Sequence, residues 1–202
     1  MTSRVTRLLR SRSLIESFLV GTILFSASCS NSLYKVKPPS ALASLPANAP
    51  SANLGAVSFR AAPLLTDEEA QELFESNLLL AGLLPVRVEI VHNGGEPVDL
   101  KKVRFHLHDS AGVSWQTLSS KQAIARILKA NGVYVYNPNS RKQFEKEVRA
   151  YELDVKTPFA HDERRRRGLV FFLSPKKEAV ASPHGLTMTI DGLTQPATLQ
   201  LN

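Results

Sequence analysis

The chain has 202 residues, of which 43% are hydrophobic and 21% charged, a composition that is typical of a globular protein and excludes wholesale disorder. Its formal net charge is +7, but Arg4, Arg7, Arg10 and Arg12 against Glu16 place +3 of this charge in the first 28 residues. The remaining +4 is modest, so the basic start of the chain indicates nothing about a partner of the rest.

The first 29 residues have the layout of an export signal. A basic segment is followed by a short apolar run, residues 18–25, and by three small residues that lead directly to Cys29, the only cysteine. The apolar run is too short to span a bilayer stably. We therefore expect residues 1–28 to be a signal peptide.

The small residues before Cys29 resemble the lipobox of bacterial lipoproteins. The resemblance implies that the Cys29 thiol is acylated and becomes the mature N-terminus, with a lipid anchor in the bacterial cell envelope. Ser30 stands where an Asp would change the sorting of such proteins, which implies the outer membrane. The alternative is a cleaved signal that leaves Cys29 as a spare thiol.

The segment after the cysteine is rich in Pro, Ala and Ser and has no apolar period. Residues 29–54 are therefore expected to be a flexible to semi-rigid tether. The 24 residues from Ser30 to Asn53 would have an r.m.s. span of about 27 Å. The alternative is that this segment packs on the domain, which we expect at residues 55–202.

The domain begins with a candidate strand at Ala56–Arg60 and a helix signal. Thr66 and Glu69 have the spacing of a capping box, in which the Thr66 hydroxyl accepts from the Glu69 amide and the carboxylate returns to the Thr66 amide. A short helix near the start of the domain follows from this pattern.

Alternation of apolar and polar residues then predicts strands. In Val86–His92 the apolar residues share one face and Arg87 and Glu89 the other, and residues 103–108 alternate in the same way. Further strands are expected at Leu153–Thr157, Gly168–Leu173, Leu186–Ile190 and Ala197–Leu201. Short strands separated by turn residues indicate a mostly β protein, an immunoglobulin-like antiparallel β-sandwich.

Residues 119–150 interrupt the strand pattern with two predicted helices. Ser119 and Gln122 form a second capping pattern, and Asn139 or Ser140 starts the second helix. This helical insertion holds seven basic and two acidic residues, a balance of +5, so the basic excess of the mature chain resides in it.

Two segments resemble a known type of protein. They are LPVRVEIVHNGGEPVDLKKVRFHLHDSAG and the later RRGLVFFLSP, which is followed by LTMTI. Both are similar to bacterial lipoproteins of unknown function with an immunoglobulin-like sandwich, and more broadly to the late-embryogenesis-abundant, water-stress type of domain. The resemblance implies a fold and a location, and it transfers no active-site residue.

His106 and His108 lie two residues apart on a predicted strand, so both imidazoles point to the same side. Such a pair can hold Zn(II) or Cu(II), although a site needs three or four ligands. The alternative is a pair of solvent-facing strand histidines.

The run of four arginines Arg164–Arg167 can bind phosphate or carboxylate groups through bidentate hydrogen bonds. The alternative is a solvated turn that leads into a strand. No aromatic residues interleave the basic ones as they do in single-strand binders, so we expect no nucleic-acid partner.

The helical insertion is the stronger candidate for a binding surface because specificity tends to reside in insertions on a rigid scaffold. Arg141, Lys142, Lys146 and Arg149 are expected to contact an envelope protein or an anionic surface component. The alternative is an ordinary solvated helix face.

No catalytic motif occurs: there is no G-x-S-x-G elbow, phosphate loop or H-E-x-x-H. We therefore expect a membrane-anchored, non-enzymatic binding or scaffolding module without a cofactor. The alternative is a periplasmic carrier of a small ligand or metal that uses His106 and His108.

Overall fold

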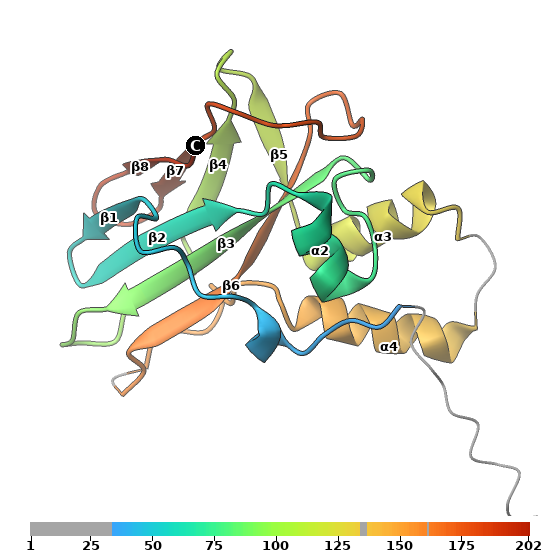
Figure 1. Cartoon of the computed structure of the whole chain (residues 1–202). Coiled ribbons are helices and arrows are strands. Elements are labelled where there is room, and N and C mark those ends of the chain that lie inside the picture. The colour runs from blue at the N-terminus through green and yellow to red at the C-terminus, as the bar shows by residue number, and fades with distance from the viewer. Residues whose placement is uncertain (1–33, 134–136, 161) are drawn as a thin grey trace, which may run out of the picture. The chain divides into compact units, whose positions relative to one another are not determined.

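Eight antiparallel strands form one continuous sheet within the part of the chain that the structure describes (Figure 1). The structure is a computed structural model, and it describes residues 34–133, 137–160 and 162–202. The strands are β1 (Ser51–Leu54), β2 (Val57–Pro63), β3 (Leu83–His92), β4 (Arg104–His108), β5 (Ser114–Leu118), β6 (Arg165–Leu173), β7 (Thr187–Asp191) and β8 (Ala197–Gln200).

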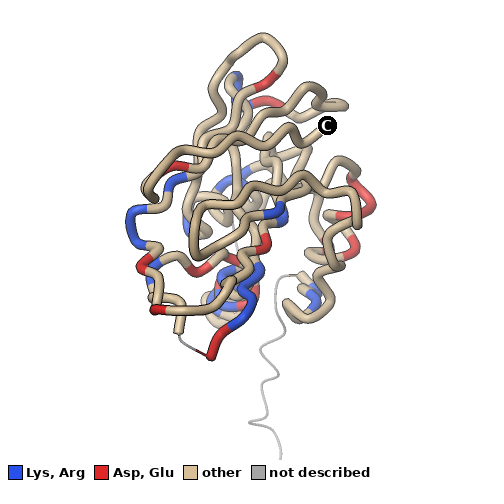
Figure 2. Tube along the Cα trace, turned by 90° about the vertical axis from the view of Figure 1, so that its left-hand side faces the viewer, with Lys and Arg blue, Asp and Glu red and all other residues tan. Residues whose placement is uncertain are grey.

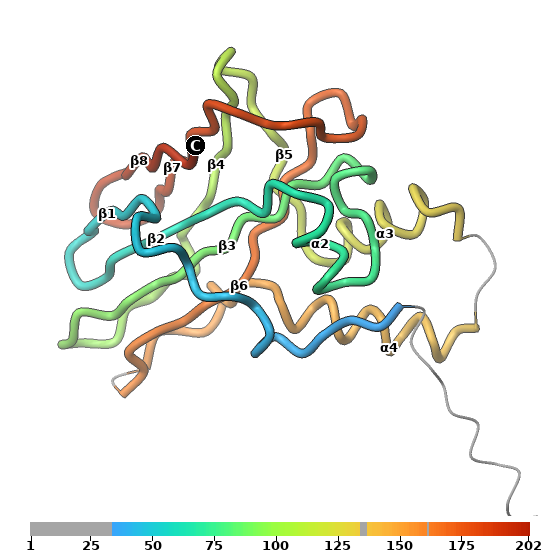
Figure 3. Tube along the Cα trace, in the orientation of Figure 1, coloured from blue at the N-terminus to red at the C-terminus, as the bar shows by residue number. Residues whose placement is uncertain are grey.

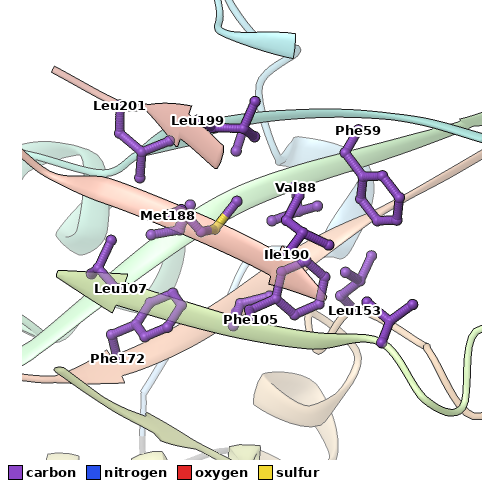
Figure 4. Packing of buried hydrophobic residues seen from close by; sticks show 14 of the residues in the cluster. Phe59, Val88, Phe105, Leu107, Leu153, Phe172, Met188, Ile190, Leu199 and Leu201 are labelled. Carbon is purple, nitrogen blue, oxygen red and sulfur yellow. The ribbon is translucent and has the colours of Figure 1, made fainter. Parts of the chain in front are cut away.

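The order of the strands in the sheet is β1-β2-β3-β6-β5-β4-β7-β8. The sheet curls until its edge strands β1 and β8 contact each other, which makes it nearly barrel-shaped. Phe59, Val88, Phe105, Phe172 and Ile190 point into the interior and form part of its apolar core (Figure 4). The expectation of a mostly antiparallel β protein is confirmed.

A second apolar cluster lies on the outer face of β3 and β6. Leu83, Leu169 and Phe171 project there and pack with buried residues of the helices, such as Ile127 and Phe144. The helices are a single 3-10 turn η1 (Pro39–Ala41), α2 (Asp67–Phe74), α3 (Ser120–Ala130) and α4 (Pro138–Arg149). The inner strands of the sheet are therefore buried on both faces.

Capping explains where α2 and α3 begin. At α3 the box is complete, because the Ser119 hydroxyl accepts from the Gln122 amide and Gln122 Oε1 accepts from the Ser119 amide at 2.9 Å. At α2 the Thr66 hydroxyl accepts from the Glu69 amide, but Glu69 Oε2 accepts from the amide of Leu65. The predicted return bond to Thr66 is therefore wrong by one residue.

Helix α4 starts earlier than the predicted Asn139 or Ser140. Asn137 is its N-cap, with a side-chain oxygen that accepts from the Asn139 amide at 2.8 Å, and Pro138 is the first helical residue. Proline suits this position because its fixed φ is helical and its missing N–H would have no partner there.

One predicted strand is absent from the structure, and two strands of the structure were not predicted. Leu153–Thr157 is not a strand: Asp154 instead accepts from the amides of Lys156 and Thr157 and forms a turn, and only an isolated bridge joins Glu152 to Leu169. Strands β1 and β5 are present where no strand was predicted.

Residues 34–50, here called the N-terminal strap, pack on the domain, in contrast to the expected flexible tether. Tyr34, Val36 and Leu42 contact the helical cluster, and the Lys37 amide donates to the Leu73 carbonyl at 2.8 Å. The strap then continues into β1, as the trace in Figure 3 shows. Three apolar side chains thus gain burial that the Pro- and Ala-rich composition did not reveal.

Charged residues that the alternation placed on an open face are covered in the structure. Arg87 and Glu89 are both buried, with exposed fractions of 9% and 3%. Glu89 lies 3.5 Å from Arg60, and Arg60 donates to the Pro46 carbonyl of the strap at 2.7 Å. The face is polar as predicted, but it is not exposed to solvent.

Among the residues that the structure describes, no helix is both long and apolar enough to cross a membrane. Residues 1–28 and Cys29 lie outside the described residues.

Tyr151 holds the strap and provides a test of its packing. Its hydroxyl donates to the carbonyls of Lys37 and Pro38 at 2.7 and 3.1 Å, and burial raises its pKa to about 12, so the donor stays protonated. We expect Tyr151→Phe to lower the free energy of unfolding by about 1 kcal/mol, measured by urea denaturation, and to speed tryptic cleavage in the strap. Tyr34→Phe is the matched control because no hydrogen bond of its hydroxyl is seen among the described residues. Equal effects of both variants would contradict the assignment.

Candidate functional site

The outward face of α4 carries the four basic residues predicted to bind a partner. Phe144 and Val148 are fully buried and fix the helix to the domain. Lys142 and Lys146 lie one turn apart, are exposed, and form no ion pair within the described residues. The structure therefore presents two ammonium groups on a rigid helix.

Arg141 and Arg149 differ from the two lysines. Glu145 lies between them and accepts from Arg141 Nε at 2.6 Å and from Arg149 Nη2 at 3.2 Å. Part of their charge is thus offset within the helix, and the cationic character of α4 is concentrated at Lys142 and Lys146.

The two other α-helices, α3 and α2, carry charges of opposite sign to each other. Helix α3 adds the exposed Lys121 and Lys129, whereas its Arg126 donates to the Ala81 and Lys177 carbonyls and has a structural role. All charged residues of helix α2 and its C-cap are acidic: Asp67, Glu68, Glu69, Glu72 and Glu75. The helical cover of the sheet therefore has an acidic end and a basic end.

The arginine run does not form one anion site, because alternation along β6 sends its members to different faces. The run directly follows the acidic Asp162 and Glu163 in the sequence, and Figure 2 shows basic and acidic segments of the trace next to one another. Arg165 lies 3.4 Å from Glu89 and Arg167 donates to the Ser44 hydroxyl at 3.4 Å, both on the outer face. Arg166 points the other way.

Arg166 is a structural clamp that the sequence did not reveal. Its guanidinium donates to both carboxylate oxygens of Glu163, to the carbonyls of Asp154, Thr157 and Pro158, and it lies 4.7 Å from the centre of the Phe159 ring. The hydrogen bond from Arg166 lowers the pKa of Glu163. The Arg166 guanidinium thus stabilises this part of the fold through contacts within the protein.

Within the part of the chain that the structure describes, no third ligand joins the two predicted metal ligands. His106 Nε2 lies 3.0 Å from Asp191 Oδ2. Among the described residues there is no group of three or more His, Cys, Asp or Glu side chains that could hold a metal ion. The pair thus resembles the solvent-facing strand histidines of the alternative prediction.

A hollow of about 470 Å³ lies beside His106, where β4 and β5 diverge. Only two residue pairs join these strands, and Thr117 bridges the gap through its hydroxyl to the Phe105 carbonyl at 2.7 Å. Phe105, Leu118 and Leu153 supply apolar walls. Sequence reasoning missed this hollow because it depends on how far two strands separate.

A second hollow of about 360 Å³ lies between the β4–β5 turn and the loop 174–184. Val113 and Trp115 line it, with Pro175, Val180 and Pro183 of the loop. Its walls are mainly apolar, and Val113 is 44% exposed. The loop residues gave no periodic signal, so no site was predicted there.

The comparisons with known proteins add no relative: no protein family, no curated protein and no solved structure matches this chain. The functional argument therefore rests on the chain's own residues.

The clamp and the outer arginines provide a matched comparison. We expect Arg166→Ala to lower the free energy of unfolding by about 2 to 4 kcal/mol, because five acceptor contacts lose their donor in a mostly buried place. Arg165→Ala, whose side chain is 59% exposed, should cost less than about 1 kcal/mol. Both are measured by thermal and urea unfolding.

The pH dependence is the control for the Glu163 contact. A carboxyl whose pKa is lowered by folding adds stability above its unfolded value, near 4.5, and loses it as the pH falls. The difference in the free energy of unfolding between wild type and Arg166→Ala should therefore become smaller below that pH. It should not vanish, because the contacts of Arg166 with carbonyl groups do not titrate. If the difference in the free energy of unfolding does not change with pH, the Glu163–Arg166 contact does not contribute to stability.

Proposed function

We propose that this protein is a membrane-anchored, non-enzymatic lipoprotein of the bacterial cell envelope that acts as a binding or scaffolding module. The observation that carries the proposal is the position of Cys29, the only cysteine, directly after small residues at the end of a basic and apolar leader. Acylation of this thiol anchors the domain, and Ser30 favours the outer membrane.

The binding surface in this proposal is the outward face of α4. Lys142 and Lys146 project from a helix that buried Phe144 and Val148 hold in place, so little backbone ordering is required on binding. A surface of exposed ammonium groups favours an anionic component of the envelope.

We also propose that the two halves of the sheet are related to an immunoglobulin-like sandwich. The support is the shared apolar core between β1-β2-β3-β6 and β4-β7-β8, with β5 paired to both halves. The antiparallel pairing of every neighbouring strand is compatible with this type.

The lipid anchor has a direct test. In bacteria that express the full chain, we expect wild type to incorporate a clickable palmitate analogue and to sediment with membranes, and Cys29→Ala to lose both properties. Ser30→Ala keeps the thiol and should keep the label. Incorporation into Cys29→Ala, or an unlabelled wild type, would overturn the proposal.

A second candidate function, carriage of a small ligand, is supported by the hollow beside His106. Arg104, His106 and Glu152 line it together with apolar residues such as Phe105 and Leu118. His106 pairs with Asp191 and Glu152 accepts from the Ser120 hydroxyl, so Arg104 is the cation that this candidate function uses. A cationic group next to apolar walls favours a small carboxylate with an apolar tail.

Decanoate is a suitable probe for this second function. It should raise the melting temperature of wild type, since a ligand at a hundredfold excess over its Kd adds about 2.7 kcal/mol of stability. Val155→Trp places a large side chain at the lining of the hollow and should remove the shift. An equal shift in both proteins, or none in wild type, would exclude carriage at this place.

A further inference from the structure

The packed strap leaves a short connection between the proposed anchor and the domain. Tyr34 is the first described residue, and its ring packs on Phe144 of α4 with the ring centres 5.0 Å apart. Five peptide units separate Tyr34 from Cys29. Even when fully extended, they reach only about 18 Å, compared with the long stand-off that a free tether would allow.

The strap is held at several points, between α4 and the C-terminal end of α2, where the Lys35 amide donates to Glu75 Oε2 at 2.6 Å. Beyond the Tyr34–Phe144 contact, the Tyr151 hydroxyl just after the helix binds the carbonyls of Lys37 and Pro38. A lipid on Cys29 would therefore hold this edge of the domain, with α4 on one side and the end of α2 on the other, within one or two Debye lengths of about 10 Å from the bilayer surface.

The charges around this attachment point are polarised. On one side α4 exposes Lys142 and Lys146, and on the other α2 exposes acidic residues, with Lys37 of the strap paired to Glu72 at 2.8 Å. An anionic surface attracts the α4 side and repels the α2 side, so the short connection and the charges favour the same orientation.

We infer that the anionic component bound by α4 is the headgroup layer of the membrane that anchors the protein. This inference rests on the proposed function, because it requires a lipid on Cys29. Lys142 and Lys146 contact anionic headgroups, α4 lies against the membrane, and the acidic α2 faces away from it.

The expected strength of docking on the membrane follows from the charges of the two lysines. Each cation close to an anionic surface favours docking about fivefold, so Lys142→Gln with Lys146→Gln should lower the docked-to-undocked ratio about 25-fold. Lys101→Gln with Lys102→Gln removes the same charge from the exposed connection between β3 and β4 and is the matched control.

The test uses the lipidated full-length protein, purified from membranes and reconstituted into vesicles. Ala150→Cys places a free thiol at the exposed end of α4, in the row of Lys142 and Lys146, and Ala111→Cys places one in the exposed β4–β5 turn. Each is labelled with an environment-sensitive fluorophore, and a lipid with a headgroup quencher is added.

In phosphatidylglycerol vesicles the label at position 150 should be quenched and the label at position 111 should not. Quenching at 150 should fall in phosphatidylcholine vesicles and in the Lys142/Lys146 variant, but persist in the Lys101/Lys102 variant. Equal quenching at both positions, or quenching that ignores lipid charge, would overturn the inference while the anchor stands.

Two further outcomes separate the alternatives. Loss of the lipid itself, seen as a missing acyl mass on Cys29, refutes the proposed function before any docking is measured. A photocrosslinker at position 150 that captures one envelope protein in cells, with no quenching in vesicles, would assign α4 to a protein partner and refute the lipid inference.

Discussion

Burial of β3 and β6 on both faces is the constraint on which the rest of the structure depends. Nine of the ten residues of β3 are buried, and so are the last six of β6, although an antiparallel sheet can leave one face in water. The inner face closes on its own core as the sheet curls. The outer face needs separate cover, which the helices and the N-terminal strap provide.

Because the outer face is covered, the charged residues beneath the cover need partners within the protein. A carboxylate as buried as that of Glu89 requires partners, and Arg60 and Arg165 lie within 3.5 Å on the two sides of its strand. Arg60 in turn donates to strap carbonyls. The strap is thus tied to the sheet by polar contacts at one end and by aromatic contacts with α4 at the other, and these contacts fix the position of Tyr34, the first described residue.

Local patterns predicted the elements whose signals are local. The Ser119–Gln122 capping box and the alternation in β3, β4 and β7 depend on neighbours in sequence, and they are present in the structure. Packing of the strap was only the alternative prediction, since its burial depends on a face of the sheet that forms only in the fold. Arg166 was missed for a related reason: within a run of four like residues, parity decides which one enters the clamp, and parity is set by strand register.

The short connection changes what two lysines can do. In free solution a pair of ammonium groups gives an affinity too weak to hold a domain on a membrane, because each contributes only about 1 kcal/mol. In the proposed lipoprotein, a lipid on Cys29 would confine the domain, so that docking would be intramolecular and the effective concentration of headgroups around α4 would be high. The same two charges then decide orientation rather than attachment. A packed strap is more effective in this respect than a long tether, since effective concentration falls as the connecting chain lengthens.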